Sequence, residues 1–475
     1  MNKHFAYYIL CLLILKNGLA ISQTHIEIIN ADEVSFNKKL NEDRQVLIGN
    51  VKTKHQNRFL ICDSAYFYSK ENKIEAFSNI HIWQGDSLNL KGDYLIYYGN
   101  HQLAEIQKNV YFTHKEMELT TEQLKYNFEF QKGYFDHKAE ISQVDKLLFS
   151  NRGVYYAKLE KFDFYDDVNI FNGTDTLNAD TLYYWLNTEY AEFRSNGNIK
   201  NNSIDVTANK GWVNQYEGTA LLTDGISITE LNNEYILHAD TCIFSEQMSY
   251  SKSYSNALLV LPQEEDSLFL TADSIIHDNT INTHILRAYN DVVFKSKNTT
   301  GKCDSLNFYT KLNLIILNNQ PVIWLDEFQL TSDTITIKLN ENSIKEAILR
   351  ESAFICTEID SVSSNQISGE TMFAHFRNNE LYNIIVEGNG ESIYYVKDDN
   401  DDKNIGVNKI ICSNMNLYIK DRKINNISFY ENPDAVLSPI KTITPEKKFL
   451  KGFKLHSKGK IIEKIQSKTQ LYYTF

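Results

Sequence analysis

The sequence predicts an all-β protein: an elongated stack of bent strands whose two sheets face each other across a continuous crease, with about 30 residues in each unit of the stack. Three observations predict this fold. The composition is typical of strands, one motif recurs along most of the chain, and the strand parity changes inside each copy of that motif.

The composition favours strands over helices and disorder. The chain has 475 residues, of which 12% are aromatic, with 29 Tyr, 26 Phe and five Pro. Aromatic residues are enriched in strands. The formal net charge is −13, whereas a protein that binds nucleic acid generally presents a basic face. We therefore expect no nucleic-acid partner.

The recurring motif is centred on an acid or an Asn, which we call the anchor. An aliphatic residue lies three positions before the anchor and a small residue one before it. An aliphatic residue follows at plus two and often an aromatic residue at plus four, as in LICDSAYFY and LKGDYLIYY. Successive anchors lie 29–33 residues apart as far as Asp333, and the last two steps are wider. The anchors are Asp32, Asp63, Asp93, Glu122, Asn151, Asp180, Asn209, Asp240, Asp273, Asp304, Asp333, Glu370 and Asn414.

The parity change predicts a bend at each anchor. In SLNLKGDYLIYY, Leu90 and Gly92 share one strand face, whereas Leu95 and Tyr97, which follow Asp93, have the opposite parity. An Asp or Asn can bond to nearby backbone N–H groups, and a bulge resets the alternation with one extra residue. The anchors repeat too evenly to form an active site, so we expect them to be structural corners. The aspartates assigned to corners are Asp32, Asp63, Asp93, Asp180, Asp240, Asp273, Asp304 and Asp333.

A second strand-like element lies between successive anchors. The segments KIEAFSNIHIW (73–83), QLAEIQKNVYF (102–112) and HILRAYNDVVF (284–294) each carry an Asn, Gln or Asp near the middle and then resume alternation. Polar turns such as SKEN and YGNH separate the elements. One unit is thus expected to contain two bent strands and two turns.

A strand bent at the anchor keeps the side chains at −3, −1, +2 and +4 in one interior. That interior can close as a packed core or stay partly open as an apolar trough, and the residues themselves leave both possibilities open. Burying one aromatic side chain removes about 150–250 Å² of surface from water. This burial can stabilise either a packed core or a bound lipid. The candidates for a lipid-facing surface are Val34, Phe36, Phe67, Leu95, Tyr97, Leu182, Tyr184, Ile275, Leu306 and Phe308.

The first 22 residues are expected to be a cleaved signal peptide. Lys3 precedes an apolar stretch over 5–15, and GLA at 18–20 supplies a small-x-small cleavage site. The apolar stretch is too short to cross a bilayer as a permanent helix. Export permits disulfides, but five widely spaced cysteines remain, and Cys62 and Cys303 take the place that Ala holds in other copies. We expect buried structural thiols.

Three regions are expected after the signal peptide. They are a β repeat domain over 23–345, continued β repeats with insertions over 346–432, and a basic Pro- and Lys-containing tail over 433–475. The tail has nine Lys from Lys441 to Lys468. It is expected to be either an extended solvated tail or a docking arm for an anionic membrane or an acidic partner.

The sequence contains none of the catalytic motifs that we sought. It lacks G-x-S-x-G, H-E-x-x-H and G-x-x-x-x-G-K. The acidic run DDNDD (398–402) resembles a calcium loop, but Lys403 and Lys409 stand where that loop needs Gly and Glu, so a hairpin tip is expected. We expect no enzymatic activity, no metal site and no cofactor.

The segment YFYSKENKIEAFSNIHIWQGDSLNLKGDYLIYY (66–98) resembles the OstA/LptA-type family, the periplasmic proteins of lipopolysaccharide transport in Gram-negative bacteria. The family's small-Asp-x-aliphatic signature matches at Asp32, Asp93 and Asp180, and its return strand resembles residues 104–110. The C-terminal region resembles that of the long OstA-like proteins of Bacteroidetes.

The resemblance implies that the elongated stack of antiparallel bent strands forms an open V, a fold called a β-taco or β-jelly roll. Its apolar interior is expected to hold the acyl chains of lipopolysaccharide or a related glycolipid. It implies a periplasmic carrier or bridge, either at the inner face of the outer membrane or between the two membranes. It also implies that other lipopolysaccharide transport proteins, or further copies of this chain, join by strand addition at exposed edges. The alternative is an envelope or surface β-solenoid with a structural or adhesive role and a filled core.

Overall fold

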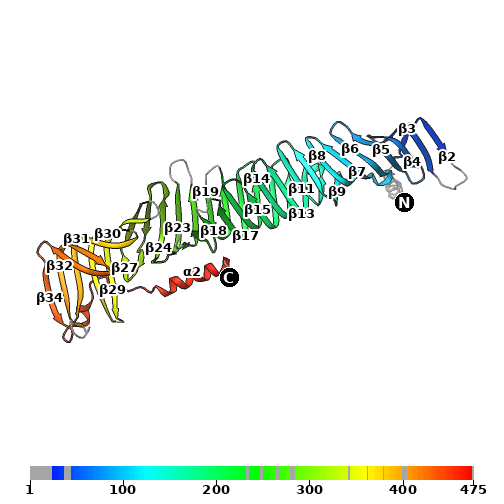
Figure 1. Cartoon of the computed structure of the whole chain (residues 1–475). Coiled ribbons are helices and arrows are strands. Elements are labelled where there is room, and N and C mark those ends of the chain that lie inside the picture. The colour runs from blue at the N-terminus through cyan, green and yellow to red at the C-terminus, as the bar shows by residue number, and fades with distance from the viewer. Residues whose placement is uncertain are drawn as a thin grey trace, which may run out of the picture. The chain divides into compact units, whose positions relative to one another are not determined.

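The structure is a computed structural model that describes residues 24–36, 44–231, 235–246, 250–262, 267–278, 284–340, 343–360, 362–377, 379–397 and 404–472. The expected signal peptide (1–22) and the acidic run 398–402 lie outside these residues. The chain divides into two compact units, Met1–Phe193 and Arg194–Phe475. Both are built almost entirely of antiparallel strands, which confirms the predicted all-β fold of stacked bent strands (Figure 1).

In the first unit, successive long strands pair antiparallel in sequence order. β9 and β10 together take the place of one long strand, and β11 and β12 take the place of the next. The elements are β1 (Glu27–Asn30), β2 (Glu33–Phe36), β3 (Arg44–His55), β4 (Arg58–Tyr68), β5 (Lys73–Gln84), β6 (Leu88–Tyr98), η2 (Gly99–His101), β7 (Leu103–His114), β8 (Met117–Asn127), β9 (Lys132–Phe135), β10 (Ala139–Gln143), β11 (Lys146–Ser150), β12 (Arg152–Tyr156), η3 (Ala157–Leu159), β13 (Lys161–Asn172) and β14 (Asp175–Trp185).

The chain leaves the first unit within β15 (Tyr190–Lys200), and the second unit repeats the same antiparallel pairing. Its elements are β16 (Ile204–Asn214), β17 (Thr219–Glu230), β18 (Ile236–Ser245), β19 (Tyr250–Tyr254), β20 (Leu258–Leu261), β21 (Leu268–Thr271), β22 (Ser274–Asp278), β23 (Ile285–Lys295), β24 (Thr299–Tyr309), η4 (Thr310–Leu312), β25 (Leu314–Asn318), β26 (Val322–Leu325), β27 (Phe328–Thr331), β28 (Thr334–Asn340), β29 (Ser343–Asp360), β30 (Ser363–Arg377), β31 (Glu380–Lys397), β32 (Asn404–Lys420), β33 (Lys423–Tyr430), β34 (Asp434–Pro439), η5 (Pro445–Lys448) and α2 (Gly459–Tyr472).

The wider spacing of the last anchors has a simple cause. β29 to β32 are 15–18 residues long, whereas β4 to β6 have 11–12 residues. The extra residues therefore lengthen the strands themselves. The expected divisions at 345/346 and 432/433 both lie inside the second unit, because β29 pairs with both β28 and β30, and β34 pairs with β32.

A register break marks each bend. Between β5 and β6, Phe77 pairs with Tyr94 and Ile80 pairs with Gly92, so two residues of β5 face Asp93 of β6. Those two residues have left-handed backbone, with φ of 61° at Ser78 and 51° at Asn79. The strand therefore bends at the anchor, and the extra residue sits on the neighbouring strand that returns the chain.

The bend brings the two halves of each strand pair face to face. The register of β7 and β8 places Tyr126 opposite Ala104, and Phe112 lies eight residues further along β7. In a flat sheet that separation would be about 26 Å. The ring centroids of Phe112 and Tyr126 are instead 5.1 Å apart. We call the two facing halves the leaves, and the space between them the interior.

The tail differs from the extended, solvated segment that was one of the two expectations. Residues 434–439 form β34, and residues 459–472 form helix α2, which lies against the second unit (Figure 1). Ile461 and Ile465 are one helical turn apart, so both fall on the face that packs against Val322 and Trp324. The i, i+4 spacing of these isoleucines was the signal in the sequence that the strand-based interpretation missed.

Candidate functional site

The interior of the first unit is the candidate site, and the +4 and +2 positions of the motif line it. Leu95, at plus two from Asp93, is 0% exposed, and Tyr97 at plus four is 5% exposed. Of the candidate lipid-facing residues, those buried in their own unit are Phe67, Leu95, Tyr97, Leu182, Tyr184, Ile275 and Leu306, while Phe308 is half-buried.

Two of the candidates are not enclosed. Val34 is 55% exposed and Phe36 is 51% exposed. Both belong to β2, which pairs with β3 on one side and, among the described residues, with no strand on the other. These side chains therefore lie on a terminal edge strand of the first unit, where the stack offers them no neighbour to pack against.

Aromatic rings fill much of the interior of the first unit. Phe112 on one leaf approaches Tyr126 and Tyr155 on the other, with centroid separations of 5.1 and 6.0 Å. Tyr155 is 4.5 Å from Phe162, which stacks on Phe164 at 4.8 Å. The aromatic residue that often follows the anchor at plus four predicted part of this cluster, namely Tyr126 and Tyr155. The sequence did not reveal that rings from the two leaves would interdigitate.

Polar side chains meet across the mouth of the interior, where the free ends of the two leaves face each other. His55 Nδ1 lies 2.6 Å from the hydroxyl of Tyr97, and Arg58 donates to the same hydroxyl at 2.9 Å. The Arg58 guanidinium also stacks over Phe128 at 4.7 Å. A cavity of about 10 Å³ remains beside these groups, lined in part by Leu60. A cavity of that size holds at most one water molecule.

Burial favours the neutral forms of the histidines and tyrosines at the mouth. Desolvation lowers the pKa of His55 and of His114, because the charged imidazolium loses hydration. It raises the pKa of Tyr97, and the nearby Arg58 guanidinium acts in the opposite direction. Burial likewise raises the pKa of Tyr126 far above its usual value. Neutral phenols and imidazoles suit hydrogen bonding between the leaves.

The anchor acids stand outside the interior, at the bends. The amide of Asn109 donates to Asp93 at 2.6 Å, and the amide of Asn79 donates to Asp63 at 2.7 Å. The same side-chain pair recurs at Asp32, Asp240 and Asp304 with Asn50, Asn256 and Asn319. At Asp273 and Asp333 the backbone N–H donates to the first left-handed residue opposite, and Asp180 lies at the register break of β13 and β14.

The five cysteines of the described residues are free and buried. Desolvation raises the pKa of Cys62, Cys303 and Cys356 to about 12. Thiols with such pKa values carry little thiolate at neutral pH and are unreactive. They therefore act as small apolar side chains within the packed sheets.

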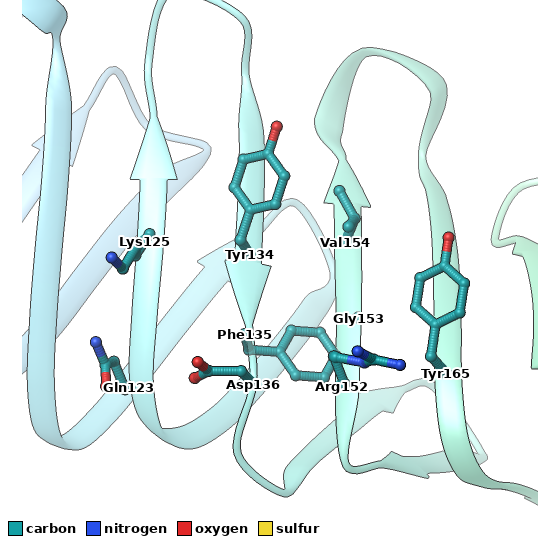
Figure 2. Close-up of a pocket in the computed structure, with 9 residues that line it drawn as sticks. All are labelled: Gln123, Lys125, Tyr134, Phe135, Asp136, Arg152, Gly153, Val154 and Tyr165. Atoms are coloured by element: carbon teal, nitrogen blue, oxygen red, sulfur yellow. The ribbon is translucent and has the colours of Figure 1, made fainter.

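A second hollow lies on the outer side of the first unit, at the place where the regular strands divide into β9, β10, β11 and β12. It has a volume of about 390 Å³. Figure 2 shows Tyr134 and Tyr165 on either side of Val154, with Arg152 and Asp136 below them. Arg152 is paired with Asp166 at 3.0 Å. No sequence motif singled out this hollow, which arises from a break in the regular pairing of strands.

The described residues contain no group of three or more His, Cys, Asp or Glu side chains that could hold a metal ion. Within the same residues, no helix has the length and apolar character needed to cross a membrane.

The comparisons with known proteins find one family model that matches part of the chain. Residues 23–180 match the family model described as OstA-like protein. Among solved structures, the chain is similar to LptH, described as the LptA homologous periplasmic component of the conserved lipopolysaccharide transport device from Pseudomonas aeruginosa. The identity is 9% and the TM-score 0.16, over 31% of this chain and 82% of that one. The curated proteins contain no match.

Proposed function

We propose, from the match of residues 23–180 to the OstA-like family model, that the chain takes part in lipopolysaccharide transport to the outer membrane. It acts as a periplasmic lipid-binding carrier or bridge, with acyl chains held in the apolar interior between its leaves. The observation that carries the proposal is the family match over a region whose interior is lined by buried apolar side chains.

The energetics of burial support an acyl ligand. Transfer of a CH₂ group from water to an apolar site is worth about 0.8 kcal/mol. An acyl chain of about 12 CH₂ groups could thus gain on the order of 10 kcal/mol, against aromatic contacts worth about 0.5–1.5 kcal/mol each. Insertion between Phe112 and Tyr155 would replace contacts between the rings by contacts between the rings and the acyl chain, so the apolar surface would stay buried.

Charge limits how the cargo is held. The net charge of −13 makes it unfavourable to bind anionic head groups along the whole length of the chain. In this proposal the acyl chains supply the affinity and most of the head group stays in water. The proposed role is that of a carrier without enzymatic activity.

The partners and location follow from the same premise. The signal peptide expected at 1–22 would export the chain to the periplasm. There it would work at the inner face of the outer membrane or between the two membranes. The free edge of β2, with Val34 and Phe36 exposed, suits strand addition by another lipopolysaccharide transport protein or by a second copy of this chain.

Site-specific photocrosslinking tests the proposal. A photoreactive phenylalanine analogue at Tyr97 would face the interior, while the same group at Tyr98 would lie on the opposite face of β6. In a Gram-negative host we expect lipopolysaccharide to be captured at position 97 and not at 98. Phe67 and Tyr66 form a second matched pair on β4. Equal capture at inward and outward positions, or no capture at either, would contradict the proposal.

The packed interior favours a second candidate function. Leu47, Ile74 and Leu90 are each 0% exposed, and rings from both leaves interdigitate. A filled core of this kind is what a structural or adhesive envelope β-solenoid needs. Under that alternative, protein purified from the periplasm carries no extractable lipid and neither inward position captures any.

A further inference from the structure

A row of tyrosines follows the mouth of the interior in the first unit. They are Tyr97, Tyr126, Tyr155 and Tyr184, and each lies four residues after a successive anchor from Asp93 to Asp180. All four are buried. Because they occupy the same place in successive copies of the motif, they lie in one row along the free end of one leaf.

Three of these tyrosines bond to polar side chains from the free end of the opposite leaf. Tyr97 meets His55 and Arg58 at 2.6 and 2.9 Å. The hydroxyl of Tyr155 lies 2.7 Å from His114 Nδ1. Lys146 donates to the hydroxyl of Tyr184 at 3.3 Å. The partners stand 38–42 residues before their tyrosines, so one geometric relation recurs in successive units.

The fourth tyrosine, Tyr126, is the exception, because the opposite leaf gives it no such polar partner among the described residues. His55 and His114 are the last residues of β3 and β7, and Arg58 and Lys146 are the first residues of β4 and β11. The position equivalent to Arg58 ahead of Tyr126 is Leu88, which begins β6 and has no polar group. Among the described residues, the buried hydroxyl of Tyr126 has no hydrogen-bond partner.

Ion pairs reinforce the same line of contacts. Lys115, in the turn after β7, pairs with Glu160, in the turn after η3. Lys146 pairs with Glu189 at 2.8 Å, with its own side chain only 11% exposed. We call the whole row of tyrosine contacts and ion pairs the seam.

We propose that the seam is a lateral gate through which acyl chains enter the interior of the first unit. This inference rests on the proposed function. At the bend the leaves are continuous backbone, held by strand pairing and by the Asn–Asp bonds, so they cannot part there. At the seam, side-chain bonds join the leaves, and next to Tyr97 the backbone of Thr24 and Ile26 also bonds to the side chains of His55 and Asn72. All these bonds can open without loss of any strand pairing.

Opening the seam also suits an amphiphile with an anionic head group. Arg58 and Lys146 lose their tyrosine partners when the leaves part. A phosphate or carboxylate at the mouth replaces the lost hydroxyls and leaves neither cation unpaired.

Removal of the tyrosine hydroxyls tests the gate. The triple variant Tyr97→Phe, Tyr155→Phe and Tyr184→Phe keeps every ring and removes the hydrogen bonds across the seam. The probe is purified lipopolysaccharide with a fluorescent acyl chain, and stopped-flow fluorescence measures the rate of its uptake. We expect the rate to rise by about tenfold, because weaker closing contacts make the open state more frequent.

Tyr126→Phe is the matched control. It makes the same chemical change in the same row, at a hydroxyl that bonds to no described residue. Because this substitution breaks no hydrogen bond across the seam, we expect its uptake rate to rise much less than that of the triple variant. A triple variant that takes up the probe no faster than Tyr126→Phe overturns the gate and leaves the proposed function standing.

Two further results keep the test decisive. If the unchanged chain takes up no lipopolysaccharide at all, both the proposed function and the gate fail. If the triple variant melts or loses its far-ultraviolet spectrum, Tyr155→Phe replaces it, since that tyrosine bonds to His114 in the seam. The gate then predicts faster uptake by Tyr155→Phe than by Tyr126→Phe, and equal rates overturn it.

Discussion

At the scale of single residues, the bends share a left-handed backbone opposite the anchor, and at several of them an Asn–Asp side-chain pair adds a hydrogen bond. Two consecutive left-handed residues face the anchor, and Asn is among the residues that tolerate that backbone best. Asn109, with φ of 51°, serves twice: it adopts the left-handed conformation, and its amide donates to Asp93. The pattern Asp in one strand and Asn sixteen residues later therefore has a local physical meaning.

Asp93→Ala should destabilise the first unit by about 1 kcal/mol, because the Asn109 amide loses its acceptor at an exposed site. Urea unfolding followed by circular dichroism measures the loss. The matched control is Asp86→Ala, an exposed aspartate in the turn before β6, which should change stability little. Equal effects of the two substitutions would show that the corner pair contributes nothing specific.

The histidines of the seam predict a pH dependence. Burial lowers the folded-state pKa of His55 and His114 below the ordinary value of 6.5. The unfolded chain then binds more protons than the folded chain below about pH 6.5, so stability falls as the pH falls. Above that pH their contribution is complete. The groups that face them are Arg58 and His25 for His55, and Lys115 and Glu160 for His114.

The measurement compares urea midpoints at pH 7.5 and 5.5. The midpoint should drop at the lower pH, and the drop should be smaller in the double variant His55→Gln, His114→Gln. The exposed His101, replaced by Gln, serves as control and should leave the drop unchanged. A double variant with the full drop would exclude the seam histidines as its source.

At the scale of elements, the tail adds an ordered layer to the outside of the second unit. Buried Gln366 donates to the carbonyl of Lys448 at 3.0 Å and accepts from the N–H of Leu450 at 2.9 Å. Gln329 binds Lys454 and His456 in the same way, at 2.8 Å for both bonds. Two glutamines thus hold an extended backbone, and α2 then covers the apolar patch of Val293, Val322 and Trp324.

Detaching α2 should expose Trp324. The double variant Ile461→Asp, Ile465→Asp places charges on the packed face of the helix, which we expect to release it and to shift tryptophan emission to longer wavelength. Each buried isoleucine contributes about 1.5–3 kcal/mol, so the second unit should also lose several kcal/mol of stability. Gln466→Asp, on the exposed face, is the control. An unchanged emission spectrum in the double variant would contradict the docked helix.

At the scale of the whole molecule, each unit buries apolar residues between its leaves, but this burial does not extend to the terminal strand of the first unit. The terminal strand β2 of the first unit exposes Val34 and Phe36, and one of its edges pairs with no strand in the described part of the chain. Such an edge is a template for another strand. This is where the proposed assembly with other transport proteins, or with further copies, would occur.

Charges on that edge should reduce self-association. The double variant Val34→Lys, Phe36→Lys removes apolar contact and adds like charges at this edge. We expect its self-association constant, measured by sedimentation, to fall by a factor of about ten or more. Val144→Lys makes a similar change at an exposed turn and should leave sedimentation unchanged. A β2 variant that associates like the unchanged chain would rule out this edge as the interface.

The all-β fold, the unit of two bent strands and the positions of most bends were predictable because they rest on short-range signals. The break between β31 and β32 lies opposite Ser413, one residue before the predicted anchor Asn414. Side-chain parity and the Asp-centred motif act within about ten residues, and each copy repeats the same information. Helix α2 was not predicted, because Ile461 and Ile465 are a short helical signal in a chain dominated by strands.

The sequence by itself thus determined the creased strand and the side-chain parity on either side of the crease. Only the tertiary structure decided how the leaves meet: that Phe112 inserts between Tyr126 and Tyr155, and that His55 reaches Tyr97 across the mouth. The Phe112–Tyr155 and His55–Tyr97 contacts join residues about 40 positions apart, on strands that are not hydrogen-bonded to each other. The Phe112–Tyr126 contact joins opposite halves of the paired strands β7 and β8. Such pairs are set by the angle of the bend and by close packing between the leaves, and neither property is encoded in any local pattern.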